Sequence, residues 1–369
     1  MFGSKKNNYL GVDLGSSSIK VVELANYSGR PRLVTYGFTE KSPTNISESG
    51  IISDVEETAA ILREVCRKSK VTANKAVAAL PNFSVFTSIL TLPSLSKKDL
   101  AAAISWEAKK IIPMPLEEII LDWKIVEEFE VGGGGADKLP ELSQEANPLK
   151  KIFSKPKKNV RVLLTGASKQ LIKKYIDIFA KCGLTLLSLE TESFALIRSL
   201  LGDDKSTVMI VDMGAATSSL VVVSKGVPVL NRSLELGGQA LTKAISMALN
   251  VNLDRAEQFK QDLSLDSETS ENSLPQTVEK AFAPILNEIS YTINLYQDSN
   301  NTKIDKLILT GGTALLGHLS GYLSNNFNIN TVIGDPWARV VYPVDLKPIL
   351  DRVGARFAVP VGLAMREIE

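Results

Sequence analysis

This chain of 369 residues has few of the residue types that form redox and metal centres: two cysteines, Cys66 and Cys182, and one histidine, His318. No CxxC motif or Cys/His cluster surrounds either cysteine, so both are interpreted as reduced, buried helix residues. A single histidine excludes a histidine-rich metal site, and any histidine-based triad depends on it alone. We expect His318 to lie in a helix after a glycine turn and to have a structural role.

Long apolar runs and an excess of one charge are also absent. No apolar run reaches the roughly 18 residues of a membrane span, and residues 1–8 are polar, without the apolar core of a signal peptide. We therefore expect a cytoplasmic protein. The formal net charge of +1 gives no general attraction to nucleic acid or to an anionic membrane. With 44% hydrophobic and 22% charged residues, the composition is that of a soluble globular protein with room for two domains.

The strongest internal signal is a strand–turn–strand pattern that occurs twice. Each copy is a short apolar strand, an Asp-x-Gly turn with small polar residues, and a second strand rich in β-branched residues. The first copy spans residues 9–24, and the second, about 200 residues later, spans residues 207–223. Each is followed by a third expected strand. The repeat predicts two similar halves related by a pseudo-twofold axis, with a cleft between them.

Helix and strand patterns alternate along the rest of the chain, which predicts the α/β class. Helices are expected at residues 54–69, 97–112, 169–181, 193–201, 241–249, 253–261, 274–300 and 315–325. Further strands are expected at residues 33–38, 75–80, 85–92, 119–130, 160–164, 227–230 and 304–309. The glycine run 132–135 and the lysine-rich segment 136–158 are interpreted as a flexible loop. A phosphate-binding role is disfavoured there, because no helix start with Lys-Ser/Thr follows.

The two Asp-x-Gly turns have the chemistry of a phosphate–magnesium clamp. Glycine lets the backbone approach an anion, and turn N–H groups and hydroxyls bind phosphate oxygens. Asp13 and Asp212 end their strands, where they can hold Mg²⁺ through its water shell. The predicted phosphate contacts are Gly15, Ser16, Ser17, Lys20, Gly214 and Thr217. The alternative is two ordinary hairpin turns without a ligand.

A third motif follows in Thr310-Gly311-Gly312-Thr313-Ala314. A strand that runs into two glycines at a helix start suits close approach of an adenosine or its phosphates. Alone, an ordinary strand-to-helix turn would explain it. Its place after the two aspartate turns favours the nucleotide, so ATP and Mg²⁺ are the expected cofactors.

The order of two phosphate turns and an adenosine motif resembles the actin-like superfamily of actin, sugar kinases, chaperone ATPases, MreB and FtsA. The resemblance implies a duplicated actin-like (ribonuclease H-like) fold around a nucleotide cleft. Residues 236–242 and 256–260 are similar to the FtsA and MreB segment that contacts the ribose and base. The implied nucleoside contacts are Gly237, Gly238, Glu257, Lys260, Gly311, Gly312 and Thr313. Residues 192–196 resemble the connecting helix, which implies Glu192 as general base; the alternative is an acid at a helix N-terminus, favoured by the dipole.

Within the superfamily, residues 1–6, 11–24, 107–118 and 361–366 resemble the type IV pilus assembly protein PilM family. That resemblance implies five regions: 1–81 with 166–201 as the first core half, 82–165 as an inserted α/β subdomain, 202–231 with 302–352 as the second half, 232–301 as a helical nucleotide-contacting subdomain, and 353–369 as a return helix. The proline-rich helix end at residues 112–115 is either a partner surface or a buried helix terminus.

The family resemblance implies a cytoplasmic ATP-binding scaffold of type IV pilus or type II secretion-like machinery. Its implied partners are the N-terminal cytoplasmic peptide of the inner-membrane protein PilN and other inner-membrane and motor components, without nucleic acid and with membrane contact only through partners. Weak ATP hydrolysis is left open. One alternative is a small-molecule kinase of the same fold, although no acceptor-site motif is found. Another is an FtsA-like filament former, which fits less well because no amphipathic tail is expected after Glu369.

Overall fold

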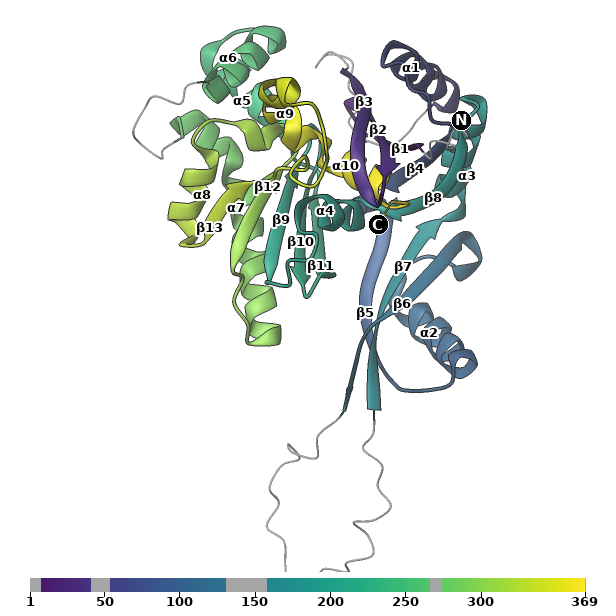
Figure 1. Cartoon of the computed structure of the whole chain (residues 1–369). Helices are drawn as coiled ribbons and strands as arrows, with labels where there is room; N and C mark the ends of the chain where they lie inside the picture. Colours follow the sequence, from purple (N-terminus) through teal and green to yellow (C-terminus); the bar gives the residue numbers. More distant parts are fainter. Residues whose placement is uncertain (1–7, 41–53, 131–157, 266–273, 369) are drawn as a thin grey trace, which may run out of the picture. The chain divides into compact units, whose positions relative to one another are not determined.

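The computed structural model describes residues 8–40, 54–130, 158–265 and 274–368 (Figure 1). The chain forms two compact units, Met1–Val85 with Leu171–Glu369, and Phe86–Gln170. Most of the predicted glycine- and lysine-rich loop lies outside the described residues, as do the opening residues 1–7 and residues 266–273.

The first half of the larger unit is a five-stranded sheet in the order β3-β2-β1-β4-β8. Its strands are β1 (Asn8–Leu14), β2 (Ser18–Tyr27), β3 (Arg30–Glu40), β4 (Lys75–Leu80) and β8 (Thr185–Thr191). Strands β1, β2 and β3 pair antiparallel, and β4 joins β1 and β8 in parallel. The helices of this half include α1 (Val55–Lys68) and α3 (Lys169–Lys181). Helix α1 begins where predicted because the Asp54 side chain accepts hydrogen bonds from the N–H groups of Glu56 and Glu57.

The second half repeats this arrangement in the order β11-β10-β9-β12-β13, with the same strand directions. Its strands are β9 (Val208–Met213), β10 (Ser218–Ser224), β11 (Val227–Leu234), β12 (Lys306–Thr310) and β13 (Asn330–Ile333). Its helices include α5 (Gly238–Leu249), α6 (Leu253–Leu265), α7 (Gln276–Asn300), α8 (Leu319–Phe327) and α9 (Lys347–Val353). The matching order and directions confirm the predicted internal repeat.

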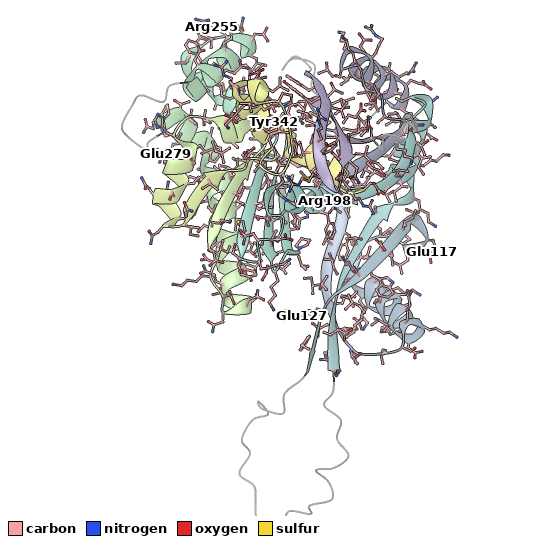
Figure 2. The ribbon with its side chains drawn as sticks, viewed as in Figure 1. Glu117, Glu127, Arg198, Arg255, Glu279 and Tyr342 are labelled. Carbon is pink, nitrogen blue, oxygen red and sulfur yellow. The ribbon has the colours of Figure 1, made fainter. Side chains whose placement is uncertain are left out.

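Helices α4 (Glu192–Leu200) and α10 (Ala358–Met365) lie between the two sheets. They share one buried cluster with Val77 of β4 and Ile210 of β9, so each sheet packs one face against this helix pair. The helices touch closely, because a Cβ on Gly362 of α10 would come within 1.9 Å of the Ala195 carbonyl oxygen. Arg198, labelled in Figure 2, also joins them, since Nη1 donates to the Gly362 carbonyl oxygen at 2.6 Å and to Glu190 Oε1 at 2.7 Å.

The smaller unit is a three-stranded sheet in the order β5-β7-β6 with one helix packed on it. Its elements are β5 (Val85–Pro93), α2 (Lys97–Ile111), β6 (Ile119–Glu130) and β7 (Lys158–Ser168). Ser96 caps α2 as predicted, because its hydroxyl accepts a hydrogen bond from the Asp99 N–H group. Leu100, Ile104 and Ala108 form the buried face of the helix, which explains the apolar spacing in this segment.

The largest errors of the sequence-based predictions are two missed strands, one missed helix and one misplaced helix start. Strands β8 and β13 and helix α9 had not been predicted. The helix expected from residue 315 begins at Leu319, because His318 has a left-handed backbone with φ of 61° that interrupts the helix. His318 is therefore the residue before the helix, not a member of it. The segment Gly312–Leu315 forms a separate short 3₁₀ turn.

Candidate functional site

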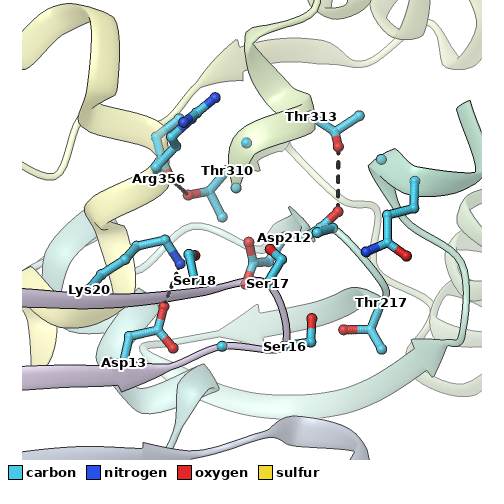
Figure 3. A pocket seen from close by; sticks show the side chains of 18 of the residues that line it. Asp13, Ser16, Ser17, Ser18, Lys20, Asp212, Thr217, Thr310, Thr313 and Arg356 are labelled. Carbon is cyan, nitrogen blue, oxygen red and sulfur yellow. Dashed lines mark hydrogen bonds and ion pairs between the residues drawn. The ribbon is translucent and has the colours of Figure 1, made fainter. Parts of the chain in front are cut away.

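A cavity of about 460 Å³ lies between the two halves of the larger unit (Figure 3). All of the predicted site residues except one line it: Asp13, Gly15, Ser16, Ser17, Lys20, Glu192, Asp212, Gly214, Thr217, Gly238, Glu257, Lys260, Gly311, Gly312 and Thr313. These residues come from both repeats, from α4 and from the helices of the second half. The cavity therefore brings together motifs that are as far apart as residues 13 and 313 in the sequence.

The first aspartate turn contains a partly buried ion pair. Asp13 of β1 stands opposite Lys20 of β2 in the antiparallel register, so the two side chains lie on the same face. Lys20 Nζ donates to Asp13 Oδ2 at 2.8 Å (Figure 3). The turn between them is tight, because a Cβ on Gly15 would lie 2.9 Å from the Ser18 carbonyl oxygen. Lys20 thus compensates Asp13 directly, at the edge of the cavity where phosphate contact had been predicted.

The second aspartate turn has the same backbone plan without the lysine. Asp212 of β9 stands opposite Ser219 of β10, the place that Lys20 occupies in the first half. The turn closes through a hydrogen bond from the Gly214 N–H group to the Thr217 carbonyl oxygen at 2.9 Å. The duplicated frame consequently presents two aspartates to one cavity with a single cross-strand lysine.

The carboxyl groups in the cavity repel one another. Burial, followed by the negative charges of Asp212 and Asp13, raises the pKa of Glu192 to about 8. Burial and the charge of Asp13 raise the pKa of Asp212 to about 6, and Lys20 opposes both shifts. A divalent cation would relieve this repulsion, and carboxylates are the ligands that Mg²⁺ prefers.

The donor set fits an ion that keeps its water shell. Across the ranges that the structure describes, no group of three or more His, Cys, Asp or Glu side chains is arranged to hold a metal directly. Mg²⁺ commonly binds proteins through one or two carboxylates plus water and substrate phosphates. Asp13 and Asp212 are the residues that would hold it in this manner.

Glu192 is fixed at the cavity wall by a segment from far along the chain. Its Oε2 accepts a hydrogen bond from the Asn82 N–H group at 2.9 Å. In return, the Ser193 N–H and hydroxyl donate to Asn82 Oδ1 at 3.3 and 2.9 Å. Glu192 is also the first residue of α4. It is therefore both an acid at a helix N-terminus and a residue of the cavity, the two positions that had been considered as alternatives. Its pKa near neutrality is suited to a general base.

We expect the charge on Glu192 to destabilise the ligand-free chain as pH rises. The ordinary pKa of 4.5 applies to the unfolded chain and the raised value of about 8 to the folded chain, so folding retains a proton between these values. Stability from this group is therefore lost as pH rises from about 4.5 to 8. Glu192→Gln keeps an oxygen acceptor for Asn82 without the charge. In urea unfolding it should match the wild type near pH 4.5 and exceed it by at least about 1 kcal/mol at pH 8. A difference that does not grow with pH would contradict this assignment.

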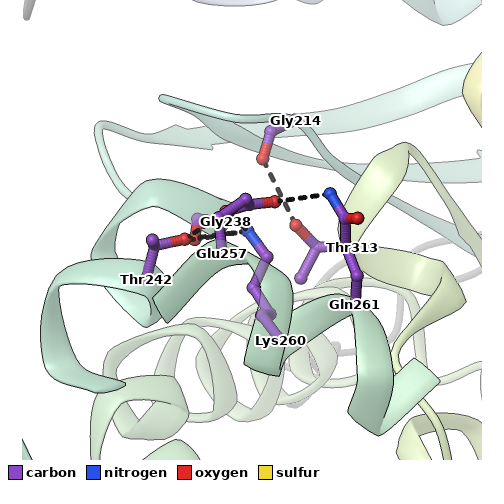
Figure 4. Close-up of polar contacts among 7 residues, drawn as sticks. All are labelled: Gly214, Gly238, Thr242, Glu257, Lys260, Gln261 and Thr313. Carbon is purple, nitrogen blue, oxygen red and sulfur yellow. Dashed lines mark hydrogen bonds and ion pairs between the residues drawn. The ribbon is translucent and has the colours of Figure 1, made fainter. Parts of the chain in front are cut away.

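A second polar network lines the cavity (Figure 4). Lys260 Nζ lies 2.6 Å from Glu257 Oε2, 2.9 Å from Thr242 Oγ1 and 3.2 Å from the Gly238 carbonyl oxygen. The Thr242 hydroxyl also donates to Glu257 at 2.6 Å. Helices α5 and α6 therefore hold the predicted Glu–Lys pair together at the cavity, in a defined orientation.

The predicted adenosine turn packs against the second aspartate turn. Gly311 has a φ of 84°, and a Cβ there would lie 2.4 Å from the Met213 carbonyl oxygen, so this position requires glycine. The Gly311 N–H group and the Thr310 hydroxyl both donate to the Ala355 carbonyl oxygen, at 2.9 and 2.8 Å. These bonds attach the segment before α10 to the cavity.

Gly237 is the predicted contact that does not line the cavity. A Cβ there would lie 2.6 Å from the carbonyl oxygens of both Gly214 and Ala215, so this glycine lets the start of α5 approach the second aspartate turn closely. Sequence reasoning also missed several lining residues: Ser18, Phe83, Gln239, Thr242, Lys243, Gln261 and Arg356. Gln239 directly follows the glycine pair and could have been found from that position. Arg356, labelled in Figure 3, lies in no motif, and only the fold brings it close to Gly312.

The comparisons with known proteins agree with this architecture. The model of the family "Type IV pilus assembly protein PilM" matches residues 11–368. Among solved structures, the chain is similar to the PilM-PilN type IV pilus biogenesis complex, with a TM-score of 0.79, 22% identity and 98% of each chain covered. It is also similar to ethanolamine utilization protein EutJ from Carboxydothermus hydrogenoformans, with a TM-score of 0.56, 15% identity and coverage of 98% and 90%.

Two further proteins are similar to this chain. MreB 5 of Spiroplasma citri bound to AMPPNP has a TM-score of 0.51 at 14% identity, covering 97% of this chain and 95% of that one. The actin-like α/β fold expected from the sequence is thereby confirmed. Cell division protein FtsA of Bacillus subtilis (strain 168) is 22% identical over 267 residues, and the match spans 69% of this chain and 58% of FtsA.

Within the described part of the chain, no helix is both long and apolar enough to cross a membrane.

Proposed function

This chain belongs to the type IV pilus assembly protein PilM family, and on that basis we propose that it is a scaffold whose central cavity binds ATP with Mg²⁺. The observation that carries the nucleotide proposal is the convergence of both aspartate turns and the Gly311 turn on one cavity. Two hairpin turns without a common ligand would not be expected to meet a third, glycine-requiring turn in one cavity. The raised pKa values of Asp212 and Glu192 further support a cationic ligand.

In the proposed complex, different cavity residues contact the metal, the phosphates and the nucleoside. Asp13 and Asp212 hold the magnesium through water, and the two turns bind phosphate oxygens. The phosphate contacts are Gly15, Ser16, Ser17, Lys20, Gly214 and Thr217. The nucleoside contacts are Gly238, Glu257, Lys260, Gly311, Gly312 and Thr313. Bound Mg²⁺ would supply positive charge that stabilises the phosphates and the ionised carboxylates.

Turnover requires more than this clamp. Glu192 would have to accept a proton from an attacking water, which its position and raised pKa allow. Its hydrogen bond from the Asn82 N–H group holds the carboxylate in place but also stabilises the ionised form, which weakens it as a base. We therefore propose that binding is the main function of the cavity and that hydrolysis, if it occurs, is slow.

We further propose that the nucleotide-bound chain binds the N-terminal cytoplasmic peptide of a PilN-like inner-membrane protein, and through it joins other pilus components. Support comes from family membership and from the similarity to a chain of the PilM-PilN type IV pilus biogenesis complex, over 98% of both chains. Membrane association would then be indirect.

Peptide binding can be tested with an immobilised synthetic N-terminal peptide of the PilN-like protein from the same organism, with and without Mg-ATP. The proposal predicts retention of the wild type, stronger with Mg-ATP. A scrambled peptide of the same composition is the control. Equal retention on both peptides would contradict the partner assignment, while specific retention that is indifferent to Mg-ATP would remove only the nucleotide dependence.

A further inference from the structure

Gln239 is a cavity residue whose side-chain amide has an unused donor. It is the second residue of α5 and follows the Gly237-Gly238 pair. Its Nε2 atom is buried and has no hydrogen-bond partner in the parts of the chain that the structure describes. Because a buried donor without an acceptor has lost its bonds to water without replacement, it destabilises the ligand-free protein. Because Gln239 itself lines the cavity, a ligand bound there would supply the missing acceptor once the side chain turns toward it.

The backbone at Gln239 is hydrogen-bonded to the second aspartate turn. The Gln239 N–H group donates to the Ala215 carbonyl oxygen at 2.9 Å, and the Gly238 N–H group donates to the Gly214 carbonyl oxygen at 2.9 Å. The close approach depends on Gly237 and Gly238, where a Cβ would meet Gly214, Ala215 or Thr313 atoms within 2.7 Å. The side chain therefore projects from a fixed point beside the turn.

These hydrogen bonds leave fewer free N–H groups at the start of α5 for binding an anion. A helix start commonly binds phosphate through its free N–H groups. Here the N–H groups of residues 238 and 239 already bond to the turn, so neither can donate to a ligand as well. The Gln239 amide then supplies, from its side chain, a donor that the backbone at these two positions cannot.

A phosphate in this cavity needs hydrogen-bond donors, because phosphate oxygens only accept hydrogen bonds. The carboxylates of Asp13, Glu192 and Asp212 are also acceptors when they are ionised, so they cannot donate to a phosphate. A neutral amide donates without adding charge to a cluster that must also tolerate Mg²⁺. We propose that Gln239 is a phosphate-positioning residue, whose Nε2 donates to a phosphate oxygen of the bound nucleotide. This inference rests on the proposed nucleotide function.

The test uses Gln239→Met, which keeps the length of the side chain and removes its polar atoms. Loss of one hydrogen bond to a charged phosphate should weaken Mg-ATP binding about 10- to 100-fold in calorimetry. The same variant should melt at a higher temperature than the wild type without ligand, because the unpaired buried donor is gone. A residue with only a structural role would lower the melting temperature instead. Gln239→Glu should bind Mg-ATP more weakly still, since it adds a negative charge.

Gln258→Met is the matched control, because Gln258 is exposed on α6 and bonds to Arg255 outside the cavity lining. It should change neither the Mg-ATP affinity nor the ligand-free melting temperature by more than the error. Wild-type binding with an unchanged affinity in Gln239→Met would overturn the role of Gln239 and leave the proposed function standing. Absence of Mg-ATP binding in the wild type would instead overturn the proposed function, and this inference with it.

Discussion

Gly362→Ala is expected to destabilise the chain by at least about 3 kcal/mol, or to prevent folding altogether. The added Cβ would lie 1.9 Å from the Ala195 carbonyl oxygen and 2.6 Å from its carbonyl carbon. Both are backbone atoms of α4, so no side-chain rotation relieves the overlap. Helices α4 and α10 would have to separate and open the buried cluster between the two sheets.

The effect should be measured by urea unfolding followed by circular dichroism. Gly312→Ala is the matched control, because the atom nearest to its added Cβ is Arg356 Nε at 3.7 Å, an ordinary contact distance. We expect that control to fall within about 1 kcal/mol of the wild type. Equal stability of the two variants would show that the helices do not touch at Gly362, and the two sheets would then be packed differently.

Asp212→Asn is expected to stabilise the ligand-free chain and to weaken Mg-ATP binding. Burial and the negative charge of Asp13 raise the pKa of Asp212 to about 6, above its ordinary 3.8. The folded chain therefore binds more protons than the unfolded chain in this range, and stability is lost as pH rises from about 3.8 to 6. Removing the charge should restore at least about 1 kcal/mol at pH 8. Loss of a carboxylate that holds the hydrated ion should weaken Mg-ATP binding about 10- to 100-fold.

Thermal melting with and without Mg-ATP measures both effects at once. Asp204→Asn is the control of opposite sign: Asp204 lies outside the cavity lining and pairs with Lys306 at 2.6 Å, and the hydrogen bond from Lys306 lowers the pKa of Asp204 to about 2. It should melt lower than the wild type at neutral pH and still gain stability from Mg-ATP. If Asp212→Asn melted lower than the wild type without ligand, the carboxylates would not repel one another as the structure indicates.

Regular patterns made much of the fold predictable. Alternating apolar residues and the two Asp-x-Gly turns predicted the repeated hairpins, and Asp54 and Ser96 marked helix starts through their side-chain oxygens. Strand β8 was missed, although its apolar residues follow directly after a helix that ends near Gly183. The start of α8 was misplaced because nothing in the local pattern shows that His318 adopts a left-handed backbone.

Site residues that belong to a local sequence motif could be predicted, whereas contacts between residues far apart in the sequence could not. Asp13, Asp212 and Gly311 could be named because turn geometry restricts the local sequence. The hydrogen bond between Asn82 and Glu192 joins residues 110 positions apart, so no local sequence pattern predicts it. The asymmetry of the two halves, with Lys20 replaced by Ser219, became meaningful only when the strand registers aligned the two positions.

The central claim is that the cavity between the two halves is a Mg-ATP site built on the paired aspartates. Calorimetric titration of Mg-ATP into the wild type and into Asp13→Ala tests it most directly. The proposal predicts one binding event per chain in the wild type and its loss in the variant, with folding of both checked by circular dichroism. Equal binding by both proteins, or binding by neither, would contradict the assignment of the site.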